Sequence, residues 1–393
     1  MIWLDEILKE AIIQRASDIH IYPDRNDMVA RFRIDGVLRE VDRRDIVYHE
    51  TVISRLKVIS RLNVIEKNVP QDGHMEVLLE WPKGLENISH ADEEGGKIAN
   101  YRVSVMPTIY GEAAVLRVLN RKDNLLSLGE LGFSDKTLVI MKKIIAHPHG
   151  VVLLTGPSGS GKTTTLYSII NTYDVKERAI LTLEDPVEYQ LANIRQTQVI
   201  PDLGVTFSVG LKAILRQDPD IIMIGEIRDE ETAEIAVRAS LAGRLVFSTF
   251  HTNDVAGAIT RMIDMEIGRS LIATALVGII AERLVRKICE KCITEVPAPK
   301  ELLDFTGIEW PSKTVLAGKG CNHCGNTGYY GRTGLFEVLE IDNELRGLII
   351  QRAPLNQINE IINNKITETL REDGFSKVRQ GITTLEEVLK VTV

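Results

Sequence analysis

Hydrophobic and polar residues follow two different periods over the first part of the chain. Apolar positions recur at helical spacing over residues 1–16 and again over residues 49–65, which predicts a helix in each segment. Between them, over residues 28–41, apolar and charged residues alternate one by one around the turn signal Asp35-Gly36. Alternation about a tight turn is typical of a β-hairpin, so this part of the chain is expected to combine helices with strands.

A second pair of alternating segments, residues 101–105 and 113–119, flanks a short turn and places Arg102 directly opposite Arg117. In one interpretation both side chains point into solvent, where the repulsion between like charges is tolerated. In the other, the two guanidinium groups bind an anion, since the planar fork of arginine bonds two phosphate oxygens at once. The preceding residues, 83–100, are rich in glycine and acids and are expected to form a loop.

From Gly150 onward, short apolar runs alternate with segments of helical spacing. This alternation favours a parallel sheet covered by helices, which is the α/β class. Polar residues follow three of the runs, and the carboxyl ends of parallel strands meet at the sheet edge where such proteins bind ligands. The expected strands are residues 151–155, 179–183, 221–224 and 245–249.

The first of these strands leads into a glycine-rich loop with the spacing G-x4-G-K-T. Glycine lets the backbone N–H groups of such a loop turn toward an anion, because no Cβ atom forbids the required dihedral angles. Lys162 would neutralise the β and γ phosphates of a nucleoside triphosphate, and the Thr163 hydroxyl would bind Mg2+. A plain glycine-rich turn is the alternative, which the flanking strand and helix disfavour. The expected nucleotide contacts are Gly156, Pro157, Ser158, Gly159, Ser160, Gly161, Lys162, Thr163 and Thr164.

Three strand ends carry side chains that suit phosphoryl transfer, namely Glu184, Glu226 and His251. Hydrolysis of a triphosphate needs a metal ion, a group that orients the attacking water and positive charge on the phosphates. Glu226 is placed to act on the metal ion, although Gly225 stands where many phosphate-loop enzymes carry an aspartate. Glu184 is the candidate for orienting water. The alternative role for either acid is to cap the helix that follows.

All four cysteines lie in two C-x2-C pairs, Cys289/Cys292 and Cys321/Cys324, separated by 28 residues. Four thiolates in this pattern suit a tetrahedral Zn2+ with a structural role, because no position on the metal stays open for chemistry. Four ordinary thiols are the alternative. Disulfides are disfavoured in a reducing cytosol.

Composition narrows the classes of function. With 393 residues the chain is longer than one hydrophobic core usually supports, so two or three domains are expected. The formal net charge of −8 argues against a free-standing nucleic-acid-binding protein. Apolar runs stay short of the roughly 18 residues of a membrane span, and the first residues lack a signal-peptide pattern. The protein is therefore expected in the cytosol.

Taken together, these motifs resemble the type II secretion and type IV pilus assembly ATPase family of the bacterial secretion ATPase superfamily. The resemblance runs from about Ala11 to the C-terminus. Besides the phosphate loop and the cysteine pairs, it rests on short signatures at residues 17–21, 70–73, 184–188, 215–220, 225–229, 248–253 and 332–334.

The resemblance implies an α/β fold in which a RecA-like, parallel-sheet ATPase domain follows a smaller PAS-like α+β domain. A zinc-binding subdomain with four cysteines and a set of C-terminal helices complete the expected chain. The implied boundaries are 1–122 for the N-terminal domain, 123–133 for a linker, 134–284 for the ATPase core, 285–332 for the zinc subdomain and 333–393 for the helical region.

The resemblance also implies a role for each candidate residue. Glu184 would position the attacking water, Glu226 would act on Mg2+ through water, and His251 would sense the γ-phosphate. Arg102 and Arg117 would reach the nucleotide when two domains close, which supports the anion-binding interpretation of the facing pair.

Partners and location follow from the same resemblance. Such proteins form homo-hexameric rings in which nucleotide-driven domain rotation pushes on an inner-membrane platform protein, so the expected location is cytoplasmic and peripheral to the inner membrane. The implied cofactors are ATP, Mg2+ and Zn2+, and no nucleic acid is expected. The four cysteines favour an extension motor over a retraction motor, and Arg332 is a candidate adenine contact.

The sequence departs from the family pattern in several places. Arg244 stands where a second histidine is usual, Lys212 where arginine is common, and Glu282 where glutamine is usual. The extra N-terminal docking domain of many relatives is expected to be absent, since Met1 falls just ahead of the helix before Ser17. The chain is then either a naturally short member or a trimmed form.

The leading hypothesis is a motor that hydrolyses ATP to assemble a type IV pilus or a type II secretion pseudopilus. A DNA-uptake or conjugation-type translocation ATPase would use the same core, and the acidic pI of about 5.6 weighs against it. A third possibility is a nucleotide-gated binding module that switches conformation without sustained turnover.

Overall fold

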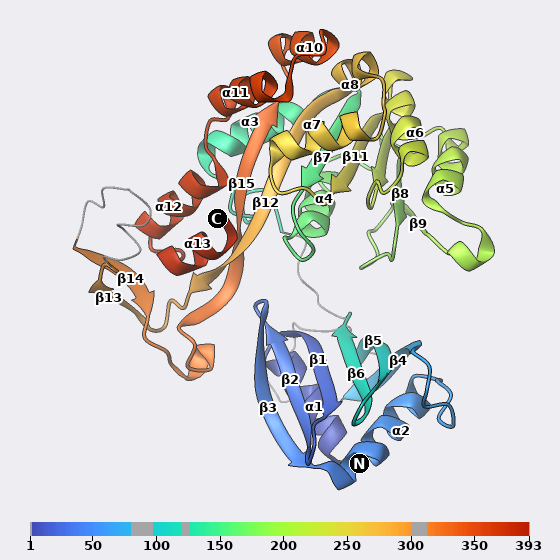
Figure 1. The fold of residues 1–393 in the computed structure, drawn as a ribbon, viewed down its shortest axis with the longest axis vertical. Helices are drawn as coiled ribbons and strands as arrows, with labels where there is room; N and C mark the ends of the chain where they lie inside the picture. Colours follow the sequence, from blue (N-terminus) through green and yellow to red (C-terminus); the bar gives the residue numbers. More distant parts are fainter. Residues whose placement is uncertain (1, 80–96, 120–125, 300–312, 393) are drawn as a thin grey trace. The chain divides into compact units, whose positions relative to one another are not determined.

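The chain folds into two compact units, residues 1–124 and 125–393, and each has its own hydrophobic core. Most of the segment expected as a linker, 123–133, belongs to the second unit. Phe133 stacks on Phe336 there, and the Leu131 carbonyl accepts a hydrogen bond from Gly334 N at 3.0 Å. The structure, a computed structural model, describes residues 2–79, 97–119, 126–299 and 313–392 (Figure 1).

The first unit is an antiparallel sheet of six strands with two helices, in agreement with the α+β expectation. The strand order is β3-β2-β1-β6-β5-β4, and α1 packs against β1. The Tyr101 hydroxyl, fully buried in β5, donates a hydrogen bond to the Leu8 carbonyl of α1 at 3.1 Å and so ties helix to sheet. The elements are α1 Ile2–Ile13, β1 Ala16–Pro23, β2 Asp27–Ile34, β3 Val37–Asp45, the 3-10 turn Ile46–Tyr48, α2 His49–Ile59, β4 Gln71–Leu79, β5 Lys97–Thr108 and β6 Gly111–Val118.

The predicted hairpin around Asp35-Gly36 is confirmed as the β2–β3 pair. Both turn residues have positive φ angles, 48° and 87°, as a two-residue turn between twisted strands requires. The predicted helix over residues 49–65 is shorter than expected and ends at Ile59, because Arg61 adopts a left-handed conformation with φ 58°. Of the expected loop at 83–100, the last four residues belong to β5, and the rest lies outside the described ranges.

The second unit is built on a seven-stranded sheet with the order β15-β12-β7-β11-β10-β8-β9. Every neighbouring pair is parallel except β12–β15, so the predicted parallel sheet is confirmed. The strands are β7 Gly150–Thr155, β8 Ile180–Glu184, β9 Arg195–Gln198, β10 Ile221–Ile224, β11 Leu245–Phe250, β12 Leu276–Ile288 and β15 Tyr329–Glu340.

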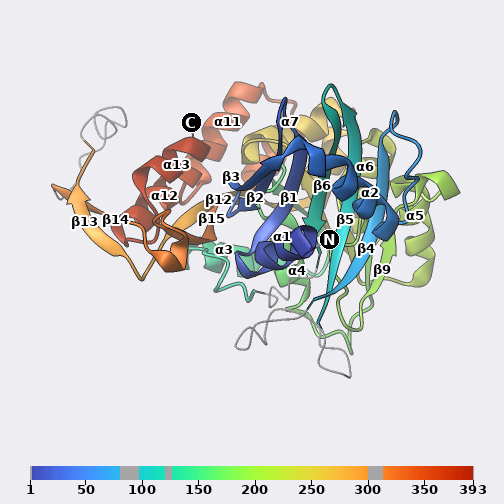
Figure 2. The ribbon, with the colours of Figure 1, turned by 90° about the horizontal axis from the view of Figure 1, so that it is seen from below.

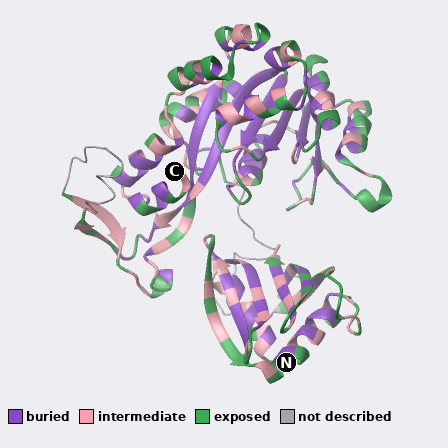
Figure 3. Ribbon diagram, viewed as in Figure 1, coloured by how far each residue is buried: buried purple, intermediate pink, exposed green. Residues whose placement is uncertain are grey.

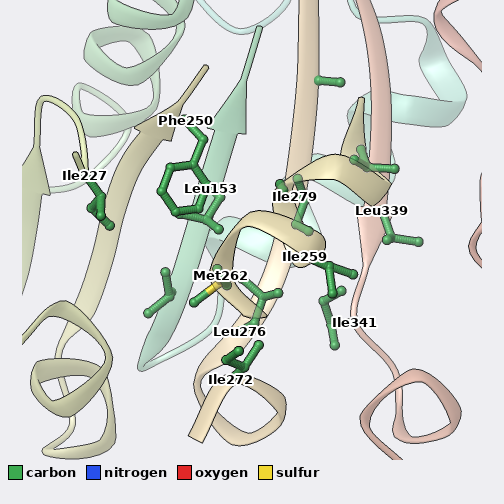
Figure 4. Close-up of a cluster of buried hydrophobic side chains, with 14 of the residues drawn as sticks. Leu153, Ile227, Phe250, Ile259, Met262, Ile272, Leu276, Ile279, Leu339 and Ile341 are labelled. Carbon is green, nitrogen blue, oxygen red and sulfur yellow. The ribbon is translucent and has the colours of Figure 1, made fainter. Parts of the chain in front are cut away.

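Helices cover both faces of this sheet, because successive residues of its buried strands point to opposite sides. Val152 and Leu154 of β7 pack with α3 and α4, whereas Leu153 packs with the helices of the other face. Figure 3 shows the resulting buried layer of strands, and Figure 4 shows Leu153 of β7 close to Met262 of α7. The helices and 3-10 turns of this part are α3 Asp135–Ile145, α4 Lys162–Ile170, Pro201–Leu203, α5 Phe207–Ile214, Leu215–Gln217, α6 Glu230–Leu241, α7 Val255–Asp264 and α8 Arg269–Ala275.

The C-terminal part of the chain differs from the expected helical region 333–393, because residues 333–340 form most of β15 in the large sheet. The helices after it pack on the same unit. Thr384 caps the last of them, with Glu387 N donating to its Oγ1 at 3.4 Å. The helices are α10 Asn343–Ile350, α11 Leu355–Lys365, α12 Leu370–Arg379 and α13 Leu385–Thr392.

A small two-stranded hairpin lies beside α12, which both Figure 1 and Figure 2 show. It consists of β13 Ile293–Pro297 and β14 Thr314–Gly318, followed by the 3-10 turn Asn322–Cys324. Across the described ranges, the helices are too short or too polar for any of them to cross a bilayer.

Candidate functional site

The predicted phosphate loop connects β7 directly to α4 (Figure 1). Gly161 immediately precedes the helix with φ 108°, a left-handed conformation that favours glycine, and no side chain caps the N-terminus of α4. The free N–H groups of the first helical turn and the helix dipole both favour an anion at this position. The Ser160 hydroxyl is buried without a hydrogen-bond partner among the described residues, so the loop has unsatisfied donors for phosphate oxygens.

The Lys162 ammonium folds back onto its own loop. Nζ donates hydrogen bonds to the carbonyl oxygens of Gly156 and Pro157 at 2.6 and 2.9 Å. Burial lowers the pKa of Lys162, and the nearby carboxyl groups of Glu282 and Glu226 partly offset this effect. Phosphate oxygens are stronger acceptors than carbonyl groups because they are charged, so the ammonium is free to exchange these partners for a nucleotide.

The remaining loop residues are accessible. Pro157, Ser158 and Gly159 are exposed, and so is Thr163, whose hydroxyl is the expected magnesium ligand. Thr164 is partly exposed. Hydroxyl and phosphate oxygens are hard ligands that suit Mg2+, so the residues present fit the predicted metal.

The strand ends bring the predicted acids and histidine to the edge of the sheet that holds the loop. Thr155 of β7 pairs with Phe250 of β11, the residue just before His251. Leu183 of β8 pairs with Ile224 of β10, so Glu184 and Glu226 follow at neighbouring strand ends.

Side-chain and backbone hydrogen bonds fasten these strand ends to one another. The Thr155 hydroxyl donates to the Thr252 carbonyl at 2.8 Å, and the Thr249 hydroxyl donates to the Gly225 carbonyl at 2.7 Å. The geometry of the loop is therefore coupled to that of the segments carrying Glu226 and His251.

Glu226 is held between the side chains of Arg228 and His251. Its Oε1 accepts a hydrogen bond from Arg228 Nε at 2.7 Å, and its Oε2 lies 3.0 Å from His251 Nε2. Burial alone would raise the pKa of Glu226, but the Arg228 and His251 contacts lower it overall. Arg228 also pairs with Asp185 at 3.3 Å. The sequence analysis did not assign Arg228, although it lies within the 225–229 signature.

Glu184 is buried, with 2% of its surface exposed, and its carboxylate is fully engaged. It accepts hydrogen bonds from the Tyr167 hydroxyl, from Thr182 Oγ1 at 2.5 Å and from Gln196 Nε2 at 3.0 Å. These hydrogen bonds fix the orientation of the carboxyl group, but one of its donors has to be exchanged for the water that it would orient. The sequence analysis missed all three donors. Only Thr182 had a signal, since it precedes Glu184 by two residues and shares its face of β8.

Arg102 and Arg117 belong to the first unit, and the predicted pairing of the two residues across β5 and β6 is confirmed. The Arg117 guanidinium donates to the buried carboxylate of Asp18 at 3.1 Å. Arg102 has no ion-pair partner within the described ranges, and His74 stands opposite it on β4. Asp18 also lies 3.7 Å from Arg33, so the facing arginines have little negative charge beside them, and their excess positive charge fits an anion.

Three further residues singled out from the sequence lie away from the loop. Arg332 of β15 pairs with Arg286 of β12. Arg286 lies five residues beyond Ala281, which pairs with Thr155 just before the loop. At the usual strand rise, these two positions on β12 are roughly 16 Å apart.

Arg244 precedes β11, whereas His251 follows it, so the two lie at opposite ends of the strand. The Arg244 guanidinium bonds the Ala242 carbonyl at 2.6 Å. Lys212 pairs on the surface with Glu231 at 2.5 Å.

The four cysteines come together beyond the ends of β12 and β15. Their Sγ atoms all lie within 4.8 Å of one another, and three of the pairs are separated by 3.8 to 3.9 Å. A tetrahedral Zn2+ with bonds of about 2.3 Å places its sulfurs about 3.8 Å apart, so the cluster fits the predicted zinc. The backbone N–H groups of Cys321 and Gly328 donate to Cys324 Sγ at 3.2 and 3.3 Å, which stabilises a thiolate.

The fold and the site together define a phosphate-loop protein with a parallel α/β sheet and a tetracysteine cluster. Comparison with known proteins identifies the family. The family model described as "Type II/IV secretion system protein" matches residues 1–390, and the chain belongs to this family. The resemblance inferred from the motifs is thereby confirmed.

Two curated relatives match nearly all of the chain. It is 45% identical over 390 residues to the type II secretion system protein E of Aeromonas hydrophila, covering 99% of this chain and 75% of that protein. It is 43% identical over 394 residues to the type IV pilus assembly ATPase PilB of Thermus thermophilus, covering 100% of this chain and 43% of that protein. The chain thus spans less than half the length of the PilB relative.

Solved structures agree on the fold. The pilus retraction motor PilT with bound ADP superposes with a TM-score of 0.62 at 27% identity, over 99% of this chain and 96% of that one. The ATPase DotB of Legionella pneumophila superposes with a TM-score of 0.69 at 22% identity, over 99% of this chain and 95% of that one, which speaks for the fold alone.

Proposed function

We propose that the chain hydrolyses ATP to drive assembly of a type IV pilus or a type II secretion pseudopilus. The observation that supports this proposal is the meeting of strand ends at one edge of the sheet. Glu184, Glu226 and His251 lie at the ends of β8, β10 and β11, and β11 pairs with β7, the strand that leads into the phosphate loop before α4. A nucleotide-binding protein without turnover would need the loop but not two acids beside it.

Each residue has a chemical task in this scheme. The loop N–H groups and Lys162 hold the phosphates, and Thr163 holds the Mg2+ that neutralises developing charge on the phosphate oxygens. Glu226 orients the water shell of that metal, and His251, hydrogen-bonded to Glu226, reports whether the γ-phosphate is present. Glu184 orients the attacking water after that water has replaced one of its three hydrogen-bond donors.

The same proposal covers the remaining residues, the oligomer and its partner. Arg102 and Arg117 on the first unit supply further positive charge to the nucleotide when the units close on each other. Homo-hexamers would act from the cytoplasmic side on an inner-membrane platform protein. The zinc cluster would have a structural role, and Arg332 would contact the adenine. The preference for extension over retraction remains a prediction.

Hydrolysis by the full chain tests the proposal. Lys162→Ala is expected to abolish both nucleotide binding and turnover, because the loop loses its charge. Glu184→Gln is expected to lower kcat by a factor on the order of 100 to 10,000, the usual contribution of a group that activates water, while Mg-ADP binding persists. Lys212→Ala, which removes a surface lysine paired with Glu231, is the matched control and should keep wild-type turnover. Undiminished turnover in Glu184→Gln would refute the role of Glu184.

The same assay separates the alternatives. Strong stimulation of hydrolysis by DNA would favour a translocation ATPase over a filament-assembly motor. Release of less than one phosphate per chain from the assembled oligomer would favour a nucleotide-gated binding module.

A further inference from the structure

Glu282 lies directly beneath the phosphate loop. It follows Ala281, the residue of β12 that pairs with Thr155 at the end of β7, and only 2% of its surface is exposed. A Cβ atom added to Gly161 would collide with the Glu282 carboxyl group at Oε1. A Cβ atom added to Gly156 would lie 2.5 Å from the Glu282 carbonyl oxygen. Glu282 therefore contacts the loop near both of its ends.

The Glu282 carboxyl group is poorly compensated for a buried acid. Its Oε2 has no hydrogen-bond partner among the described residues. Arg283, the next residue, directs its guanidinium to the Asn253 carbonyl at 2.7 Å and to the backbone carbonyl of Glu282, not to the carboxyl group. A buried carboxylate with an unpaired oxygen is costly, so the neutral acid is the stable form.

The charged groups around Glu282 do not reverse this preference. Burial raises the pKa of Glu282 to about 8, and the Thr165 hydroxyl and the Lys162 ammonium only limit the increase. The other charged groups act on the neighbours of Glu282. Glu226, beyond the end of β10, and Arg283 act on Lys162, while Asp254 and Glu337 act on Arg283. At neutral pH the carboxyl group consequently keeps its proton, and Lys162 bonds to loop carbonyl groups.

We propose that Glu282 is a positioning residue for Lys162: neutral Glu282 leaves the ammonium free for nucleotide phosphates, whereas ionised Glu282 competes for it and repels them. This inference rests on the proposed nucleotide binding at the loop. The opposition between the two states follows from charge alone. A bound triphosphate and an ionised Glu282 would both place negative charge next to the Lys162 ammonium. Nucleotide binding and ionisation of Glu282 then oppose each other.

The proposal predicts a specific dependence of nucleotide affinity on pH. Bound nucleotide would raise the pKa of Glu282 further, so binding takes up a proton and the affinity falls as the pH rises above about 8. The total loss of nucleotide affinity is about tenfold for each pH unit by which bound nucleotide raises the pKa of Glu282. The measurement is the Kd of Mg-ADP for the full chain between pH 7 and pH 9.5.

Two variants make the test specific. Glu282→Gln, a neutral isostere, is expected to bind Mg-ADP as tightly as the wild type at pH 7 and to lose the decline above pH 8. Glu337→Gln is the matched control, because Glu337 is also a buried acid with a pKa raised by burial, on the neighbouring strand, but it accepts hydrogen bonds from Leu370 N and Val255 N. It should keep the wild-type decline.

The outcomes are distinct. A Glu282→Gln protein that keeps the decline, or that binds Mg-ADP much more weakly at pH 7, overturns the proposal. If this variant does not fold, calorimetry of the wild type at pH 8 in buffers of different ionisation enthalpy decides the question. Uptake of a fraction of a proton on Mg-ADP binding supports the proposal, and no uptake overturns it. Absence of Mg-ADP binding at every pH would instead refute the proposed nucleotide site.

Discussion

Glu184 and Glu226 both follow strands of the same sheet, yet their surroundings differ. Glu226 is flanked by Arg228 and His251 at a partly open edge, whereas Glu184 is closed in by the neutral donors Tyr167, Thr182 and Gln196. Spacing along the sequence was sufficient to find both acids. It could not find their partners, because Tyr167 and Gln196 come from other elements and meet Glu184 only through the fold.

The buried hydroxyl of Tyr167 stabilises the Glu184 carboxylate. Tyr167→Phe removes this donor and is expected to lower the free energy of unfolding by about 1.5–3 kcal/mol, the range for a hydrogen bond to a charged group. The affinity for Mg-ADP should stay unchanged, because the hydroxyl is directed at Glu184 and not at the loop. Urea unfolding and a Mg-ADP titration measure the two effects.

Tyr173→Phe provides the control for that measurement. The Tyr173 hydroxyl donates to the neutral Ile145 carbonyl at 2.6 Å, so its removal should cost about 0.5–1.5 kcal/mol. Equal losses for the two variants would contradict a stronger hydrogen bond from Tyr167 to Glu184 than from Tyr173 to the backbone.

Among the elements, the antiparallel pair β12–β15 connects the seven-stranded sheet to the cysteine cluster. The two strands pair from Gly278 to Ile288, and the cysteines lie just beyond this end of the pair. The sequence indicated the cluster but not the strands. The C-x2-C spacing is a local signal, whereas the apolar start of β12 fits a buried strand or a buried helix equally well. The expected helical region also began too early, at residue 333 inside β15.

Loss of the metal should therefore loosen the cluster and leave the phosphate loop intact. The protein purified without chelator is expected to contain about one zinc per chain, and Cys292→Ser should lose most of it. Amide hydrogen exchange should then accelerate over residues 289–297 and 314–328, while α4 keeps its protection. Much less than one zinc per wild-type chain would contradict the assignment of the cysteine cluster as a zinc site. Faster exchange in α4 would contradict the expectation that the phosphate loop stays intact without the metal.

At the scale of the whole molecule, each of the two units has groups that attract an anion. Among the residues that the structure describes, the second unit has the phosphate loop with its unpaired Ser160 hydroxyl, and the first has two facing arginines of which only Arg117 is paired with an acid, Asp18. The sequence predicted the facing pair because register in a hairpin follows from the turn. It did not reveal that Asp18 already neutralises part of the charge on Arg117, since β1 joins the pair from far along the chain.

Because Asp18 neutralises part of the charge on Arg117, Arg102 is expected to have the larger effect on catalysis of the two. Arg102→Ala removes a guanidinium that has no ion-pair partner in the described ranges, and kcat for ATP hydrolysis is expected to fall by about tenfold or more, the equivalent of one charge-assisted hydrogen bond. Mg-ADP binding should change little, because the loop and Lys162 provide most of it. Arg43→Ala is the control, since Arg43 lies in the same sheet but is satisfied locally by Glu40 and Asp27. Wild-type kcat in Arg102→Ala would mean that the first unit contributes no charge to the reaction, and the facing pair would then be a solvated surface.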